Sequence, residues 1–209
     1  MDKPHIYISI DVEATGVSPT TSSCTMVGCV VFRDYDVQPD TPEEDWVIEK
    51  KQWCISEVRG RTMDESGPCY QQFWSKNLEV LEYIRKNEVD PTTAMESFAR
   101  WYSDLKGKYN CTFVARPASY DWQWINTLYD EFAPANKPPL PFSITCISTI
   151  NKLLVELGVS HNDIIKPLIT HPKFNNTHYA DEDALHQAYM YLRMLNWMRK
   201  NVIFKDLGQ

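Results

Sequence analysis

The sequence predicts an α/β fold in which strands come first and helices follow. Residues 6–10 place isoleucine at every second position, a spacing typical of a strand with a buried face. Residues 25–32 form a second apolar run that is rich in valine and too short for a typical helix. Residues 91–105, by contrast, carry apolar side chains at helical spacing. Together these patterns indicate a sheet flanked by helices.

Length and composition indicate one compact domain that spans residues 1–209. A chain of this length with 43% hydrophobic residues can bury a full core. The net charge of -7 argues against an extended surface that coats nucleic acid, because such binding needs many Lys and Arg contacts to phosphates. A local site that grips phosphate through a metal ion is compatible with this charge.

The cysteines and the apolar runs predict a soluble, cytoplasmic protein without a membrane partner. The six cysteines form no Cys-x-x-Cys pair, and Cys29 and Cys111 lie in apolar, strand-like runs. We therefore expect reduced, buried thiols. No charged segment followed by an apolar one opens the chain, and no apolar run approaches the ~18 residues that cross a bilayer.

The first strand ends in two acids, Asp11 and Glu13. Residues i and i+2 of a strand point to the same side, so both carboxylates project into one small volume. Like charges this close repel, and divalent cations such as magnesium or manganese would neutralise them. The alternative is a pair of solvated acids at a strand end, and these residues alone favour neither. Gly16 lets the backbone turn sharply after them.

Two further strands are predicted to follow the first in an antiparallel meander. Residues 17–24 are a Ser/Thr/Pro loop between the first strand and the second, which covers residues 25–32. Residues 33–45 are a polar connection. Residues 46–55 have the aromatic and β-branched content of a third strand, and their charged middle suggests an edge position.

A partly helical insertion is predicted at about 56–90. Its first part mixes Gly and Pro with aromatic residues and is predicted to be mainly loop. Arg59 and Arg61 beside these aromatics suggest a platform for phosphates and stacked bases. The alternative, somewhat favoured, is that Phe73 and Trp74 simply begin an amphipathic helix. That helix would continue through Leu78, Leu81 and Ile84.

The next elements are a helix, a strand and a second helix. Asp90 as N-cap and Pro91 as first residue predict a helix start, and Gly107 is predicted to end that helix. Residues 111–115 form a short apolar strand, after which Asp121 starts a helix. Asp121 is either a helix cap, the commoner role of a lone Asp there, or part of a metal cluster. The apolar stripe of the helix comprises Trp124, Ile125, Leu128 and Phe132.

Residues 134–141 hold four of the 13 prolines and predict a stiff, irregular connection. Residues 147–157 and 162–168 are predicted to form modest helices, with Gly158 between them.

The last informative stretch, 177–184, leads into a long helix marked by apolar residues at 185, 188, 192 and 195. A His at a helix start is usually structural, and so are acids in a first turn. The complete set changes this interpretation. The chain presents, in order, Asp11, Glu13, Asp121, His178 and Asp183, which are four carboxylates and one imidazole.

By these motifs the chain resembles the DEDDh 3'-to-5' exonucleases of the ribonuclease H-like superfamily, which include proofreading exonucleases, oligoribonuclease and ribonuclease T. Asp-Val-Glu-Ala-Thr-Gly at 11–16 resembles the first motif, Ala-Ser-Tyr-Asp at 118–121 the second, and the His-x4-Asp pattern at 178–184 the third. The resemblance implies a mixed five-stranded sheet flanked by helices. It also implies two divalent ions, Mg²⁺ or Mn²⁺, and release of nucleoside 5'-monophosphates from a 3' end.

The resemblance also implies a role for each residue. Asp11 would bridge two ions about 3.5–4 Å apart, Glu13 and Asp183 would hold the ion with the attacking water, and Asp121 the other. Imidazole has a pKa of ~6.5, which suits His178 as general base. Tyr179 lies at the Tyr-x3-Asp spacing of the sister DEDDy group and is the alternative. Expected contacts to the terminal nucleotide are Thr15, Gly16, Met26 (or Val27), Phe73 and Trp74.

Two other functions are weighed against an exonuclease. A non-catalytic nucleic-acid-binding or scaffold protein would be expected to lack a carboxylate of the set, and none is missing. An endonuclease would need a basic groove for both strands, and the sequence has no such run. The expected partner is a single strand or another nucleic acid with a free 3' end. RNA against DNA stays open, as does a homodimer.

Overall fold

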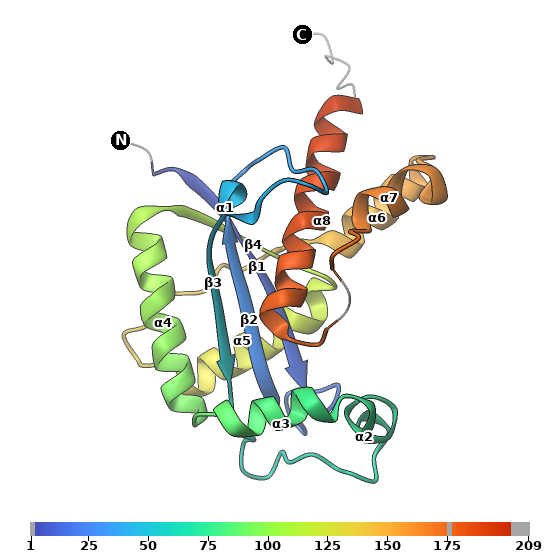
Figure 1. The fold of residues 1–209 in the computed structure, drawn as a ribbon. Coiled ribbons are helices and arrows are strands. Elements are labelled where there is room, and N and C mark those ends of the chain that lie inside the picture. The colour runs from blue at the N-terminus through green and yellow to red at the C-terminus, as the bar shows by residue number, and fades with distance from the viewer. Residues whose placement is uncertain (1–2, 175–176, 202–209) are drawn as a thin grey trace.

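A computed structural model describes residues 3–174 and 177–201 and contains a mixed five-stranded sheet. Its strands are β1 (His5–Ala14), β2 (Cys24–Phe32), β3 (Val47–Cys54), β4 (Asn110–Ala115) and β5 (Thr145–Cys146). The spatial order is β3-β2-β1-β4-β5, and Figure 1 shows β3, β2 and β1 side by side. β1, β2 and β3 pair antiparallel, whereas β4 is parallel to β1 and β5 is parallel to β4. The predicted meander, the edge position of β3 and the α/β class are confirmed.

Helices cover both faces of the sheet, and Figure 1 shows α4 and α8 on opposite sides of the strands. One face carries α4 (Pro91–Lys108) and α5 (Ala118–Phe132). The other carries α8 (Ala180–Asn201) and a smaller group, namely α6 (Ile147–Glu156), the π-helix η2 (His161–Ile165) and α7 (Lys166–Ile169). The remaining helices are α1 (Glu43–Trp46), α2 (Pro68–Gln72), the 3-10 helix η1 (Trp74–Lys76) and α3 (Leu78–Asn87).

The alternation of β1 divides the core into two layers. Ile6, Ile8 and Ile10 pack in one cluster with residues of α4 and α5, whereas Tyr7 packs in another with residues of α8. Successive side chains of a strand point to opposite faces. Asp11 and Glu13 therefore lie on the face that α8 covers.

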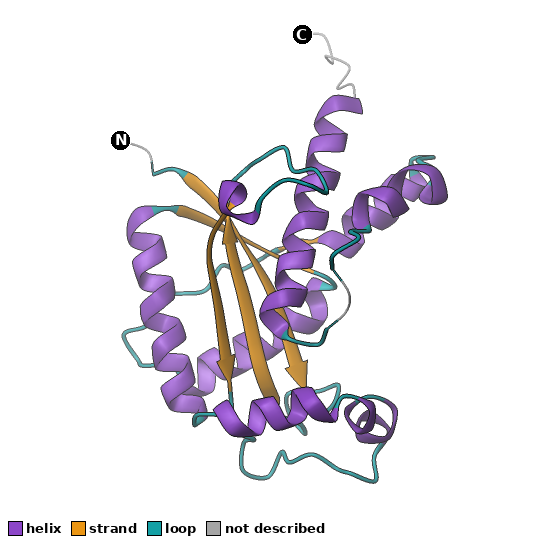
Figure 2. Cartoon of the chain, viewed as in Figure 1, coloured by secondary structure: helices purple, strands orange, loops and turns teal. Residues whose placement is uncertain are grey.

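The region 56–90 differs from its prediction in one respect. Figure 2 shows a long loop after β3, as expected, followed by short helices rather than one continuous helix. Trp74 is fully buried, but Leu78 is 50% exposed and so does not belong to the apolar stripe that was predicted for it. The break at Asn77, whose backbone is not helical, turns α3 away from η1. Val80, Leu81 and Ile84 form the buried face of α3 instead.

Most predicted helix boundaries hold within three residues. The Asp90 carboxylate caps α4 by accepting a hydrogen bond from the Thr93 N–H at 3.0 Å. Gly107 does not end α4, because the helix continues to Lys108. α5 begins at Ala118, so Asp121 lies in its first turn rather than at its start. Helix α1 was not predicted.

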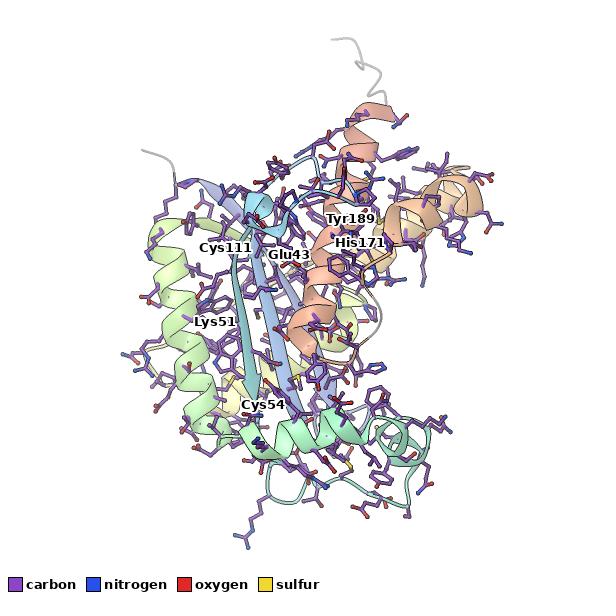
Figure 3. All side chains as sticks on the ribbon, viewed as in Figure 1. Glu43, Lys51, Cys54, Cys111, His171 and Tyr189 are labelled. Atoms are coloured by element: carbon purple, nitrogen blue, oxygen red, sulfur yellow. The ribbon has the colours of Figure 1, made fainter. Side chains whose placement is uncertain are left out.

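The six cysteines are free, as expected, although only Cys24, Cys29 and Cys54 are buried. Cys69, Cys111 and Cys146 are partly exposed, which corrects the expectation of fully buried thiols. Figure 3 shows Cys54 and Cys111 well apart.

Within residues 3–174 and 177–201, no helix has both the length and the apolar character needed to cross a membrane.

Candidate active site

The carboxyl ends of the parallel strands β1 and β4 create the place for the site. Their pairing ends at Ser9 and Val114, after which the chain leaves β4 and enters α5. Asp121, in the first turn of α5, then reaches back to β1 and accepts a hydrogen bond from the Val12 N–H at 3.2 Å. Its carboxylate thereby replaces the lost strand partner and lies beside the end of β1.

The start of α8 brings in the third motif from the opposite side. In the register of the sheet, Gly28 of β2 pairs with Asp11. A Cβ on Gly28 would lie 2.0 Å from the carbonyl carbon of Ala180, so only glycine lets α8 begin this close to the sheet. This close approach places Asp183, in the first turn of α8, on the same face as Asp11.

A tight turn before α8 orients His178. The Asp183 carboxylate accepts hydrogen bonds from the N–H groups of Thr177 and His178, at 3.4 and 3.2 Å. His178 has φ +60°, in the left-handed region that few non-glycine residues adopt. These bonds explain the His-x4-Asp spacing physically, because the acid of the motif holds the turn that carries its histidine.

Residues 171–174, which precede this turn, are also anchored. The buried His171 ring meets Tyr189 of α8 edge-on, with ring centres 4.6 Å apart, and both are labelled in Figure 3. The Lys173 N–H donates to Nδ1 of His171 at 3.0 Å, and Nε2 of His171 lies 3.1 Å from the Pro39 carbonyl oxygen. These contacts hold residues 171–174 in place shortly before the third motif begins at His178.

All five residues of the predicted set line one cavity of about 440 Å³. The cavity is lined by Asp11, Val12, Glu13, Ala14, Cys69, Phe73, Arg116, Tyr120, Asp121, His178, Asp183, His186, Gln187 and Met190. Asp121, Asp183 and Glu13 are 2%, 8% and 9% exposed, and Asp11 is somewhat more exposed toward the cavity. Four largely buried acids from β1, α5 and α8 therefore converge on this cavity.

Burial and mutual repulsion favour the protonated forms of these acids. Burial raises the pKa of Asp121 to about 7. Burial also raises the pKa of Asp11 well above its usual value, and the nearby Asp121, Glu13 and Asp183 charges add to the rise. The pKa values of Glu13 and Asp183 are raised by burial as well. A cation bound among the four acids would favour their ionised forms.

Glu13, His178 and Asp183 form the tightest group of metal-ligand atoms among the described residues, with one atom of each within 4.8 Å of the others. Nδ1 of His178 lies 3.6 Å from Oε1 of Glu13. The Glu13 carboxylate raises the pKa of His178, partly opposed by burial. The Phe73 ring meets the imidazole edge-on at 4.7 Å. His178 is thus a partly exposed imidazole beside two acids.

The side chains of His178 and Tyr179, the two candidate general bases of the third motif, point in different directions. His178 lines the cavity, whereas the ring of Tyr179 packs edge-on against Tyr83 of α3, with ring centres 5.1 Å apart. Tyr179 does not belong to the cavity lining.

The expected nucleotide contacts separate into one residue that lines the cavity and four that do not. Phe73 lines it. Met26 and Trp74 are fully buried, and Trp74 donates a hydrogen bond from its indole nitrogen to the Ala14 carbonyl at 3.1 Å, so neither can stack on a base in this conformation. Thr15 is buried and its hydroxyl accepts from the Ser23 N–H at 2.9 Å. Gly16 has no positive φ; a Cβ there would lie 2.2 Å from the Ser22 hydroxyl oxygen.

The predicted arginine platform is not formed as expected. Arg61 makes two hydrogen bonds to the Glu131 carboxylate, at 2.8 and 2.9 Å, and so ties the loop of the insertion to α5. Arg59 is exposed and does not line the cavity.

Sequence reasoning missed several residues of the cavity, above all Gln187 and Arg116. The Gln187 side chain donates a hydrogen bond to Oδ1 of Asp11 at 2.6 Å. Gln187 follows Asp183 by four residues, so helical spacing put it on the same face of α8 and would have identified it. Tyr120 donates to the Gly16 carbonyl at 3.1 Å and closes another wall.

The donor set fits divalent metal ions. It consists of hard carboxylate oxygens, which suit Mg²⁺ and Mn²⁺. Oδ2 of Asp121 is buried and has no hydrogen-bond partner among the described residues. A buried carboxylate oxygen without a donor is costly unless a cation occupies the space beside it. Asp11, Glu13, Asp121 and Asp183 are the residues available to hold such ions.

Comparison with known proteins relates the chain to 3'-5' exonucleases. The chain is 27% identical over 197 residues to a 3'-5' DNA exonuclease, Cap18, of Escherichia coli, an alignment that covers 88% of this chain and 86% of that protein. Residues 6–195 match the family described as the 3'-5' exoribonuclease Rv2179c-like domain. That match spans most of the chain and includes every acid of the cavity. The chain therefore belongs to the Rv2179c-like family of 3'-5' exonuclease domains.

Proposed function

We propose that this 3'-5' exonuclease is a metal-dependent enzyme of the DEDDh type with a ribonuclease H-like fold in one domain, and that residues 56–90 are an insertion in it. One observation carries the proposal: four acids from three separate elements converge in one cavity, and one buried carboxylate oxygen there has no partner among the described residues. Repulsion within such a cluster of ionised acids lowers the stability of the folded protein, and bound cations would offset this repulsion.

Asp11, Glu13, Asp121 and Asp183 would hold two ions, Mg²⁺ or Mn²⁺. When bound, the ions would polarise the scissile phosphate and lower the pKa of the attacking water. The backbone N–H groups of Val12, Thr177 and His178 hold two of the four carboxylates, so Asp121 and Asp183 are oriented without a bound ion. This preorganisation favours rapid ion binding.

His178 is the proposed general base. Its imidazole is partly exposed to the cavity and lies beside the Glu13 carboxylate, which stabilises the imidazolium formed when His178 takes a proton. The packing of Tyr179 against Tyr83 supports His178 over the tyrosine alternative. Phe73, next to the imidazole, is the proposed stacking surface for the terminal base.

The proposed substrate is a nucleic acid with a free 3' end, from which nucleoside 5'-monophosphates are released. The family description refers to RNA and the Escherichia coli relative to DNA, so both sugars belong in the test. A homodimer stays a prediction, which light scattering in solution tests.

The test is a panel of RNA and DNA oligonucleotides, single- and double-stranded, labelled at the 5' or the 3' end. With Mg²⁺ or Mn²⁺, a 3' label should be released first as a mononucleotide, and chelator should stop the reaction. Asp11→Ala should abolish turnover. Glu182→Gln is the matched control, because Glu182 is an exposed acid beside Asp183 that does not line the cavity. Activity that survives in Asp11→Ala or in chelator would place the chemistry elsewhere, and binding without turnover would favour a binding module.

A further inference from the structure

Arg116 is the one cavity residue with a permanent positive charge among those the structure describes. It follows the last residue of β4 and precedes α5, so the connection that delivers Asp121 also delivers a guanidinium to the same cavity. In a protein with a net charge of -7, an arginine beside four acids would be expected to form an ion pair with one of them.

No such pair is formed. Within residues 3–174 and 177–201, Arg116 makes no salt bridge, and its one side-chain hydrogen bond runs from Nη1 to the sulfur of Met190 at 3.6 Å. A thioether is a weak acceptor, and a guanidinium has five N–H donors. Arg116 is also exposed. Most of its donors therefore have no partner among the described residues, although the side chain borders the cavity.

The guanidinium lies toward the α8 end of the cavity and not over the acids. Its hydrogen-bond partner there is Met190, three residues after Gln187 on α8. His186, one residue before Gln187, lines the same cavity. Burial lowers the pKa of His186, and a hydrogen bond with the Ile169 carbonyl partly opposes this effect. The nearby charge of Arg116 lowers the pKa further. Because Arg116 contacts Met190 and forms no ion pair with the acids, its positive charge is displaced from the place where metal ions would hold the scissile phosphate.

We propose that Arg116 binds the phosphodiester adjacent to the scissile one, on its 5' side. This inference rests on the proposed function, because it takes the four acids as the position of the scissile linkage. A strand with a free 3' hydroxyl carries no phosphate beyond its terminal nucleotide, so a second phosphate near the site can only lie on the 5' side. The planar guanidinium matches a phosphate with two parallel hydrogen bonds, and it supplies positive charge where the rest of the cavity is acidic.

The test compares two trinucleotides with a free 3' hydroxyl and a 5' fluorophore. One has ordinary phosphates, and the other has a neutral methylphosphonate at the linkage next to the scissile one. Wild type, Arg116→Met, Arg116→Lys and Arg100→Met are assayed for cleavage with Mg²⁺ and for binding by fluorescence anisotropy with Ca²⁺. Arg100 is the control, since it is an exposed arginine of α4 that does not line the cavity. Thermal melting verifies that each variant is folded.

On the all-phosphate substrate, Arg116→Met should lose about 10- to 100-fold in kcat/KM, mainly through KM, with a similar loss in binding. Arg116→Lys should lose less in kcat/KM, because lysine keeps the positive charge but lacks the two parallel N–H donors of the guanidinium. On the methylphosphonate substrate, wild type and Arg116→Met should be equal. Equal losses on both substrates, or no loss, would overturn the assignment while leaving the exonuclease intact. Phosphate-dependent binding through Arg116 without any cleavage would support the subsite and refute the proposed function.

Discussion

Asp121→Asn should stabilise the metal-free protein at alkaline pH, although it should abolish activity. Burial raises the pKa of Asp121 from 3.8 to about 7. Since one pKa unit corresponds to ~1.4 kcal/mol, keeping this group ionised costs the folded state about 4 kcal/mol above pH 7. Asparagine resembles the protonated acid: its Oδ1 can still accept from the Val12 N–H, and its amide nitrogen takes the place of the unpartnered Oδ2.

The pH dependence follows from the sign of this shift. An acid with a raised folded-state pKa binds its proton more tightly in the folded protein than in the unfolded chain. The stability from the proton is fully present below pH 3.8 and is lost as the pH rises through about 7. In chelator, Asp121→Asn should exceed wild type by about 4 kcal/mol at pH 8, which corresponds to about 8–16 °C in Tm. The difference should fall to about 1–2 kcal/mol at pH 5.

Urea unfolding at both pH values, followed by circular dichroism, measures this difference. Asp130→Asn is the matched control, because Asp130 is an exposed aspartate on the same helix, and its stability should stay within ~0.5 kcal/mol of wild type. Mg²⁺ at about 100 times its Kd should stabilise wild type by ~2.7 kcal/mol and the variant by less. A variant less stable than wild type at pH 8, or a difference that does not change with pH, would refute the reasoning.

Three further predictions concern the proton, the support of Asp11 and the approach of α8. His178→Ala should lower kcat ~100-fold while Tyr179→Phe is mild, and the rate should rise with pH through the raised pKa of His178; the reverse ranking in folded variants would assign the base to the tyrosine. Gln187→Leu removes the donor to Asp11, so the Mg²⁺ concentration for half-maximal rate should rise ~10-fold or more; an unchanged Mg²⁺ titration would contradict this. Gly28→Ala should cost ~1–3 kcal/mol of unfolding free energy and much of the activity, whereas Gly107→Ala, which has open space around it, should be neutral or stabilising.

Features written in local patterns were predictable from the sequence. The alternation of β1 fixed which side Asp11 and Glu13 share, and the Asp90–Pro91 pair marked the start of α4. The position of His178 five residues before Asp183 was visible as a motif. All five residues of the predicted set were found on one cavity.

Features that depend on tertiary contacts were not predictable in this way. β5 has two residues and exists through its pairing with β4, so no local pattern marks it. Met26 and Trp74 were expected to contact the terminal nucleotide, yet packing among β2, the end of β3, α3 and the start of α8 buries them completely. Arg116 lies two residues before the second motif and is not part of it. Its importance appears only when the cavity shows which charges have partners and which do not.

The hydrogen bonds that hold the acids connect the instability of the metal-free cluster to its affinity for metal ions. Val12, Thr177 and His178 donate backbone N–H groups to Asp121 and Asp183, and Gln187 donates to Asp11. Backbone donors cannot follow a side chain that swings away, so Asp121 and Asp183 would lose these hydrogen bonds if they moved apart from the other acids when the cavity holds no cation. The same repulsion that destabilises the empty cluster then becomes free energy of ion binding, because a divalent ion removes it without rearrangement. A looser cluster would be more stable without metal and would bind metal less tightly.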